Sequence, residues 1–156
     1  MTDHLRHYSK NIPYIIGYRY FHDQKLDISK KYFLTSVAEG KHVAPSYYML
    51  AHISGVLEKD LSKAQDLFDK AIAHDPEYTS GYYGRARVAI EGNRIEHALD
   101  DLEEAVLKRE GHAHCYDINR IGESDMGWNQ RIFTNPRFEI IRKHCKKQEE
   151  ILRIGR

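Results

Sequence analysis

The sequence has few cysteines and no long hydrophobic run, and each shortage excludes a class of protein. Two cysteines among 156 residues rule out a small scaffold held by several disulfides. No apolar stretch approaches the roughly 18 residues of a membrane-spanning helix, and the start MTDHLRHYSK lacks the apolar segment of an export signal. We therefore expect a soluble cytoplasmic protein that does not enter a membrane. In that compartment the two cysteines, thirty positions apart, are expected to be free thiols.

An excess of charge of one sign is also missing. The formal net charge is +1, although residues 131–156 carry eight Lys or Arg against three Asp or Glu. A nucleic-acid-binding surface needs an extended row of cations, and Glu149 and Glu150 interrupt this basic end. We therefore do not expect nucleic acid to be the main partner.

The stretch GHAHC is the strongest candidate for a metal site. His112, His114 and Cys115 are of the residue types that bind zinc. Adjacent positions of one helix point in different directions, so His114 and Cys115 diverge, and further ligands such as His144 and Cys145 are scattered. A chain of this length also buries a core without help from a metal. We therefore expect neither a metal site nor a cofactor.

Motifs that would indicate catalysis are absent as well. The sequence contains no phosphate-binding loop of the G-x-x-x-x-G-K type, no G-x-G-x-x-G and no H-E-x-x-H. Ser124 lies near glycines in GESDMG, but Met126 occupies the place of the second glycine of a nucleophile elbow, so we expect a loop. The acidic run DDLEE at 100–104 fits the solvated face of a helix better than a catalytic pair. We expect that the protein is not an enzyme.

Apolar residues recur at intervals of three and four along most of the chain, which is the periodicity of an amphipathic helix. Residues 61–72 and 95–106 show it most clearly, and Asp60 is placed as an N-terminal cap before the first of these stretches. Prolines and glycines divide the chain into segments of roughly helical length. Strand-like alternation is scarce, so the sequence predicts an all-α fold.

Three pairs of predicted helices share one spacing of small and aromatic residues. The shared positions of the second helices are Ser29, Phe33 and Ser36, then Ala64, Phe68 and Ala71, then Ala98, Leu102 and Ala105. Those of the first helices are Pro13, Ile16, Gly17 and Tyr20, then Tyr47, Leu50, Ala51 and Ser54, then Tyr82, Arg85, Ala86 and Ala89. We expect the small residues of paired helices, such as Gly17 and Ser29, to face each other where the backbones approach. One extra residue near HISGVLEKD predicts a longer turn in the second pair.

This spacing resembles the tetratricopeptide repeat, a helix pair of about 34 residues. The resemblance covers residues 11–110 and implies repeats at about 11–43, 44–77 and 78–110. It further implies that the chain is a single domain in which antiparallel helix pairs stack as a short right-handed α-solenoid. A partial fourth unit and a capping helix would fill the remainder, 111–156. Several positions depart from the family pattern, since Pro13 replaces an aromatic residue and Arg85 an apolar one. A helical bundle without repeats remains the alternative.

The end of the chain predicts a long helix that closes the array. Asn135 is placed as an N-terminal cap, and Pro136 stands at the first helical position. The stripe beyond them consists of Phe138, Ile141, Cys145, Gln148 and Leu152. A repeat array needs such a cap because its last pair otherwise exposes an apolar face. We expect Phe138, Ile141 and Leu152 to cover the last repeat, and the preceding MGWNQRIFTNPRF resembles the closing segment of tetratricopeptide arrays.

In arrays of this family the first helix of each pair lines a concave groove that commonly holds a peptide or a helix of a partner. The residue after each shared aromatic position is a tyrosine in all three units, and we expect these tyrosines to face the groove. The expected partner-binding residues are Tyr14, Tyr18, Phe21, Tyr48, His52, Tyr83, Arg87 and His114. Tyr47 and Tyr82 are then core residues. We call this assignment of sides the phase of each first helix. If the phase is wrong by one residue, Tyr47 and Tyr82 exchange roles with Tyr48 and Tyr83.

The resemblance and the tyrosines predict a non-enzymatic protein–protein interaction module. Tyrosines supply a large contact area at low entropic cost. Arg87 and the histidines are suited to a carboxylate or an acidic segment, whereas the tyrosines argue against the chaperone carboxyl termini that some family members grip with Lys, Asn and Arg. Two alternatives remain open. One is a small immunity or antitoxin protein that neutralises a specific toxin, and the other is a nucleic-acid-associated protein that uses the basic terminal helix.

Overall fold

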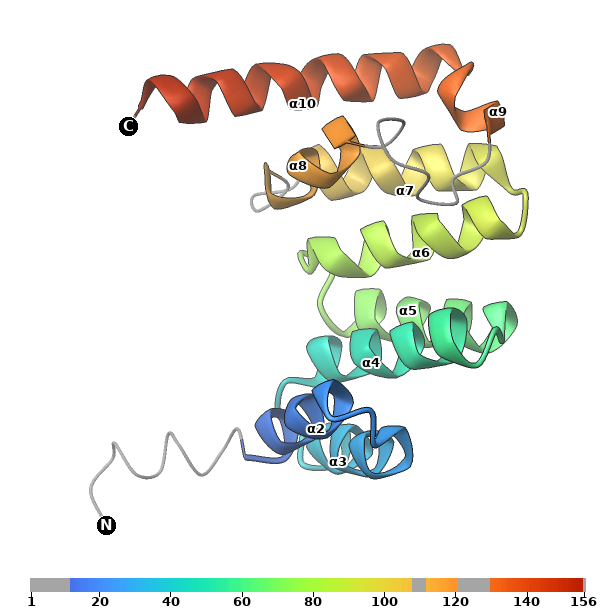
Figure 1. The fold of residues 1–156 in the computed structure, drawn as a ribbon, viewed down its shortest axis with the longest axis vertical. Helices are drawn as coiled ribbons and strands as arrows, with labels where there is room; N and C mark the ends of the chain where they lie inside the picture. The colour runs from blue at the N-terminus through green and yellow to red at the C-terminus, as the bar shows by residue number, and fades with distance from the viewer. Residues whose placement is uncertain (1–11, 108–111, 121–129, 156) are drawn as a thin grey trace. The chain divides into compact units, whose positions relative to one another are not determined.

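The computed structural model describes residues 12–107, 112–120 and 130–155. Every regular element within these ranges is a helix, which confirms the all-α prediction (Figure 1). The chain forms two compact units, Met1–Asp75 and Pro76–Arg156. The loop predicted at GESDMG and the first part of the closing segment lie outside the described residues. Among the helices that are described, none is long and apolar enough to cross a membrane.

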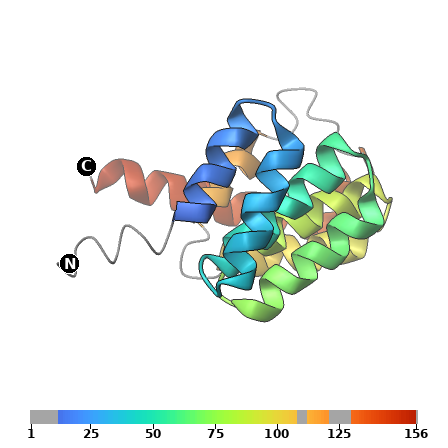
Figure 2. The ribbon, with the colours of Figure 1, turned by 90° about the horizontal axis from the view of Figure 1, so that it is seen from below.

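The first unit contains two helix pairs. α2 (Ile12–His22) packs against α3 (Leu26–Ala38), while α4 (Val43–His52) and the π-helical turn η1 (Ile53–Leu57) pack against α5 (Leu61–His74). α3 also packs against α4, so the unit is continuous (Figure 2). The positions of these helices agree with the first two helix pairs expected from the sequence.

Small residues hold α2 and α3 at close range, as the spacing predicts. The hydroxyl of Ser29 donates a hydrogen bond of 2.8 Å to the carbonyl oxygen of Gly17. A Cβ atom added to Gly17 would lie 3.0 Å from the ring of Phe33, so glycine leaves room for this fully buried ring. Ala51 and Ala64 hold the equivalent positions of α4 and α5, and both are fully buried.

The extra residue of the second pair does not lengthen the turn, which corrects the prediction from HISGVLEKD. The turn has three residues in each pair, and the additional residue is taken up in η1. There the backbone N–H of Glu58 donates to the carbonyl oxygen of Ile53, five residues back, at 3.1 Å. A π-helical turn absorbs one inserted residue without breaking the helix. Ile53, Ser54 and Gly55 remain buried, so the packing of this pair is preserved.

The turns inside the three helix pairs share one backbone conformation. Gln24, Lys59 and Asn93 have φ angles of 59°, 59° and 57°, in the left-handed region. A left-handed residue is a common way to end a helix, because it lets the following N–H groups reach the last free carbonyl oxygens. The same local geometry therefore recurs at the interval of the sequence repeat.

The second unit begins with the third helix pair, α6 (Thr79–Glu91) and α7 (Ile95–Leu107). It continues with α8 (His112–Arg120), the short α9 (Gln130–Phe133) and the long α10 (Pro136–Ile154). α10 packs against α7, α8 and α9. The shared core includes the buried side chains Leu99, Leu102, Ile118, Ile132, Phe138 and Ile141.

An ion pair fills the position where Arg85 departs from the repeat pattern. Its Nε and one terminal nitrogen donate to the two carboxylate oxygens of Asp101 at 2.8 and 2.6 Å. The Asp101 side chain is only 9% exposed, so this carboxylate does not lie on a solvated face as DDLEE was expected to. A buried carboxylate needs such a partner, because an unpaired charge is costly to desolvate. The pair thus joins α6 to α7 at the position that Ile16 and Leu50 hold in the first two helix pairs.

The terminal helix begins as predicted but ends without covering the core. The Asn135 side chain accepts a hydrogen bond of 2.9 Å from the backbone N–H of Arg137, and Phe138 and Ile141 are buried. Leu152, which was expected in the core, is 48% exposed. The last buried residue of α10 is Cys145. α10 therefore covers the core with its first half only.

A single arginine ties the start of α10 to the acidic face of α7. Arg137 lies 3.1 Å from Glu96, 2.7 Å from Asp100 and 3.0 Å from Glu103. The three carboxylates belong to successive turns of α7. Two of the four acidic residues of DDLEE, Asp100 and Glu103, are therefore engaged by α10.

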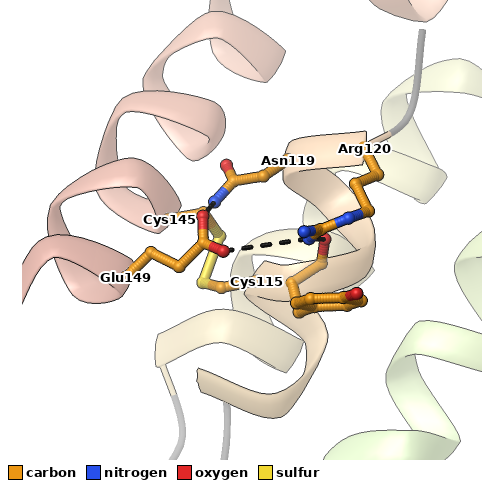
Figure 3. Close-up of a disulfide and its surroundings, with 6 residues drawn as sticks. Cys115, Asn119, Arg120, Cys145 and Glu149 are labelled. Atoms are coloured by element: carbon orange, nitrogen blue, oxygen red, sulfur yellow. Dashed lines mark hydrogen bonds and ion pairs between the residues drawn. A yellow bond between two sulfur atoms is a disulfide. The ribbon is translucent and has the colours of Figure 1, made fainter. Parts of the chain in front are cut away.

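The two cysteines form a disulfide between α8 and α10, which corrects the expectation of free thiols (Figure 3). The Cα atoms of Cys115 and Cys145 lie 4.7 Å apart, and both residues are buried. Asn119 donates a 2.8 Å hydrogen bond to Glu149 beside the disulfide, and Arg120 lies 3.8 Å from the same carboxylate. The pairing depends on how α8 and α10 cross, and a separation of thirty residues does not reveal this.

Removal of the disulfide should destabilise the second unit. The chain-entropy model assigns about 3 to 4 kcal/mol to a cross-link that closes a loop of this length. We expect the variant with Cys115→Ala and Cys145→Ala to lose that free energy of unfolding in urea titrations. Reductant should lower the stability of the wild-type protein by a similar amount and leave the double variant unchanged. Equal stability of the oxidised and reduced wild-type protein would contradict the cross-link.

Candidate functional site

Five of the eight expected partner-binding residues lie together in the first unit. α2 supplies Tyr14, Tyr18 and Phe21, and α4 supplies Tyr48 and His52. We call these five residues the aromatic surface. Helical spacing of three and four places the residues of each helix on one side, and contacts between the rings join the two helices.

Ring contacts run without interruption across the aromatic surface. Along α2 the ring centroids of Tyr14 and Tyr18 lie 6.3 Å apart, and those of Tyr18 and Phe21 lie 6.5 Å apart. Phe21 reaches α4 through His52 at 5.7 Å, and His52 stacks on Tyr48 at 6.4 Å. These distances fall within the usual range for interacting aromatic pairs. The five side chains therefore form one continuous set of rings.

Two histidines that the sequence analysis did not select extend this set. His22 meets Tyr18 edge-on at 4.6 Å, and His42 stacks on Tyr14 at 5.1 Å. Both histidines are exposed. His22 is one turn beyond Tyr18 and could have been found from that spacing. His42 precedes α4 in a left-handed conformation, outside any helical pattern, so periodicity alone could not have identified it.

The aromatic surface rests on buried phenylalanines. Tyr14 contacts Phe33 at 5.7 Å and Tyr48 contacts Phe68 at the same distance. Phe33 and Phe68 hold the same position in successive second helices and are almost fully buried. Tyr14 and Tyr48 are consequently half-buried and fixed, whereas Tyr18 is 44% exposed. A partner would meet rings that are already ordered, which lowers the entropic cost of binding.

The Tyr14 phenol is half-buried beside other tyrosines of this surface. Burial raises the pKa of Tyr14, and the neighbouring Tyr18 and Tyr48 raise it further. The Tyr14 phenol therefore stays neutral across the physiological range and keeps its O–H as a hydrogen-bond donor. The surface combines apolar ring area with polar groups at its edges, which suits the binding of a peptide.

The other three expected residues, Tyr83, Arg87 and His114, lie in the second unit. The ring of Tyr83 stacks on His114 at 4.8 Å, and His114 Nε2 lies 2.9 Å from the hydroxyl oxygen of Thr79. Tyr83 is 9% exposed and His114 is 8% exposed. Arg87 is half-buried on α6. The structure thus joins Tyr83 and His114 to each other inside the unit.

The burial of Tyr83 corrects the phase expected for α6. His114, at the start of α8, covers the Tyr83 ring, and Tyr83 joins the core of the second unit. Tyr82, expected in the core, is half-buried, and its hydroxyl donates to the carbonyl oxygen of Pro76 at 3.2 Å. On α4, Tyr47 and Tyr48 are both half-buried, so neither of the two phases describes that helix fully.

Three of the five residues considered for zinc, His114, Cys115 and Cys145, are engaged in other contacts. His114 is held by Tyr83 and Thr79, and Cys115 is held in the disulfide. Across the described ranges, no group of three or more His, Cys, Asp or Glu side chains could hold a metal ion.

A scan against protein-family models finds no match, and no curated protein is significantly similar to the chain.

Unfolding measurements on α6 variants test the corrected phase. Tyr83→Ala removes a core ring and its stack on His114, so we expect a loss of about 3 to 5 kcal/mol in the free energy of unfolding. Tyr82→Ala removes a half-buried ring, and we expect a smaller loss of about 1 to 2 kcal/mol. A larger loss at Tyr82 than at Tyr83 would restore the phase expected from the sequence.

Proposed function

We propose that the protein is a non-enzymatic binding module that holds an extended peptide or a helix of a partner protein on the aromatic surface. The observation that carries this proposal is the continuous set of rings from Tyr14 to Tyr48 across two helices. Aromatic residues with ordered neighbours are enriched among the residues that dominate binding energy. These rings offer a large contact area for a partner at the surface of the first unit.

A tetratricopeptide-like repeat array is the architecture we propose for this module. Three helix pairs at the expected positions, the contact between Gly17 and Ser29, and the recurring left-handed turns support it. In a right-handed solenoid of such pairs, the first helices would line the concave side. α2 and α4 are first helices, so the aromatic surface would belong to that side.

The cytoplasmic location stays a prediction, and the disulfide weakens one argument for it. Disulfides persist mainly in oxidising compartments, whereas the prediction assumed free thiols. The buried pair of Cys115 and Cys145 is compatible with a protein that folds in such a compartment. The disulfide does not form part of the proposed binding surface, because the aromatic surface lies in the first unit and both cysteines lie in the second.

Substitution of exposed rings tests the proposed function. A photo-crosslinking residue at position 18 should capture a partner from the native source, and the purified partner then allows affinity measurements. We expect Tyr18→Ala to weaken binding by about thirtyfold, as for a hot-spot ring worth about 2 kcal/mol. Its effect on folding should stay near ±0.5 kcal/mol, since Tyr18 is largely at the surface.

Tyr116→Ala is the matched control for this experiment. Tyr116 is 54% exposed on α8, outside the aromatic surface, so its loss should leave partner affinity unchanged. Equal affinities of the wild-type protein and both variants would remove the aromatic surface as the binding site.

A further inference from the structure

The second half of α10 contains no buried residue. Cys145 is the last buried residue of α10, and the helix continues to Ile154. At a rise of 1.5 Å per residue, this extension is about 13 Å long. Within it Glu149 is engaged by Asn119 and Arg120 of α8. The outward side of the extension keeps both cationic and large apolar side chains.

One stripe on the outer face of α10 alternates apolar and cationic residues. It consists of Ile140, Lys143, Lys147, Ile151 and Ile154, at intervals of three or four residues. The isoleucines are 66%, 54% and 86% exposed, and both lysines are exposed as well. We call these five residues the outer stripe. It extends over about 21 Å, with lysines in the middle and isoleucines at both ends.

A second copy of the chain does not fit the outer stripe. Lys147 lies at its centre, so an antiparallel pair of stripes would place Lys147 opposite its own symmetry mate. A parallel pair would place each lysine opposite itself. Like charges in direct contact oppose association. A partner of the outer stripe must therefore carry groups other than cations opposite the two lysines.

An anionic membrane and a nucleic acid fit the stripe less well. A helix that lies in a membrane surface needs a continuous apolar face, and here Lys143 and Lys147 interrupt it. Phosphate groups would pair with the two lysines, but they leave the three isoleucines in water. A helix that carries carboxylates in its middle and apolar side chains at its ends matches both features.

α10 already makes one contact of this kind within the chain. On its inner side, Arg137 binds the carboxylates of Glu96, Asp100 and Glu103 on the acidic helix α7. Cations of α10 are therefore placed where they can bind carboxylates on successive turns of a neighbouring helix. The outer stripe offers the same chemistry on the opposite side, with isoleucines added.

We propose that the outer stripe of α10 docks an acidic amphipathic helix of another protein. Carboxylates of that helix would pair with Lys143 and Lys147, and its apolar residues would cover Ile140, Ile151 and Ile154. The outer stripe shares no residue with the aromatic surface, so it would be a second binding site of the protein.

Two synthetic helical peptides with one apolar pattern test this proposal on the full chain. One peptide carries Glu at the two positions opposite the lysines, and the other carries Lys there. We expect the Glu peptide to bind at least tenfold more tightly by fluorescence anisotropy, and Ile151→Ser with Ile154→Ser to weaken it at least tenfold. Tighter binding of the chain to phosphatidylserine vesicles or duplex DNA than to the Glu peptide would overturn the proposal.

Charge reversal on and off the outer stripe provides the matched control. Lys143→Glu with Lys147→Glu should abolish binding of the Glu peptide. Lys146→Glu with Arg153→Glu makes the same change in net charge beside the stripe, and it should reduce the affinity less than threefold. Circular dichroism should show nearly the same helix content for both variants, since all four residues are exposed and the ion pair of Arg153 with Glu149 is an exposed one that contributes little. Equal losses in the two variants would mean that net charge, and not the stripe, attracts the peptide.

Discussion

Close approach of paired helices is the constraint on which the first unit depends. Gly17 has no Cβ, so α2 can lie against α3 with the ring of Phe33 beneath it and the Ser29 hydroxyl bonded to its carbonyl oxygen. A side chain at position 17 would crowd the Phe33 ring, because its Cβ atom would lie only 3.0 Å from that ring. Because Phe33 also supports Tyr14, a change at this buried crossing would move a ring of the aromatic surface. The packing of the pair and the geometry of the candidate site therefore cannot vary independently.

The residue beneath each first helix explains why the three tyrosines differ. Phe33 and Phe68 lie under Tyr14 and Tyr48, and both tyrosines stay half-buried at the surface. Leu102 holds the same position in the third pair, where the smaller side chain offers no ring to support Tyr83. Tyr83 instead stacks on His114 and joins the core. One pattern of tyrosines in the sequence thus produces two different environments.

Periodicity predicted the helices and their pairing well, because both depend on residues close together in the chain. The Asp60 cap, the Asn135 cap and the buried Phe138 and Ile141 followed from local spacing. Five of the eight expected partner-binding residues do lie together on two first helices, and their role in binding stays a prediction. The disulfide, the burial of Asp101 and the exposure of Leu152 could not be predicted in this way. Each depends on where a distant helix crosses or ends.

Two arginines that face α7, one from α6 and one from α10, are paired with its carboxylates. This distinguishes the inner side of α10 from its outer side. Arg85 replaces an apolar residue, and Asp101 on the facing helix balances its charge. Arg137 likewise meets three carboxylates of α7, so both of these arginines are paired with carboxylates of that helix. On the outer face of α10, Lys143 and Lys147 stand among exposed isoleucines, with no helix of the described chain packed over them. The outer stripe therefore differs from the contacts inside the unit, and the proposed docking of an acidic helix would account for this difference.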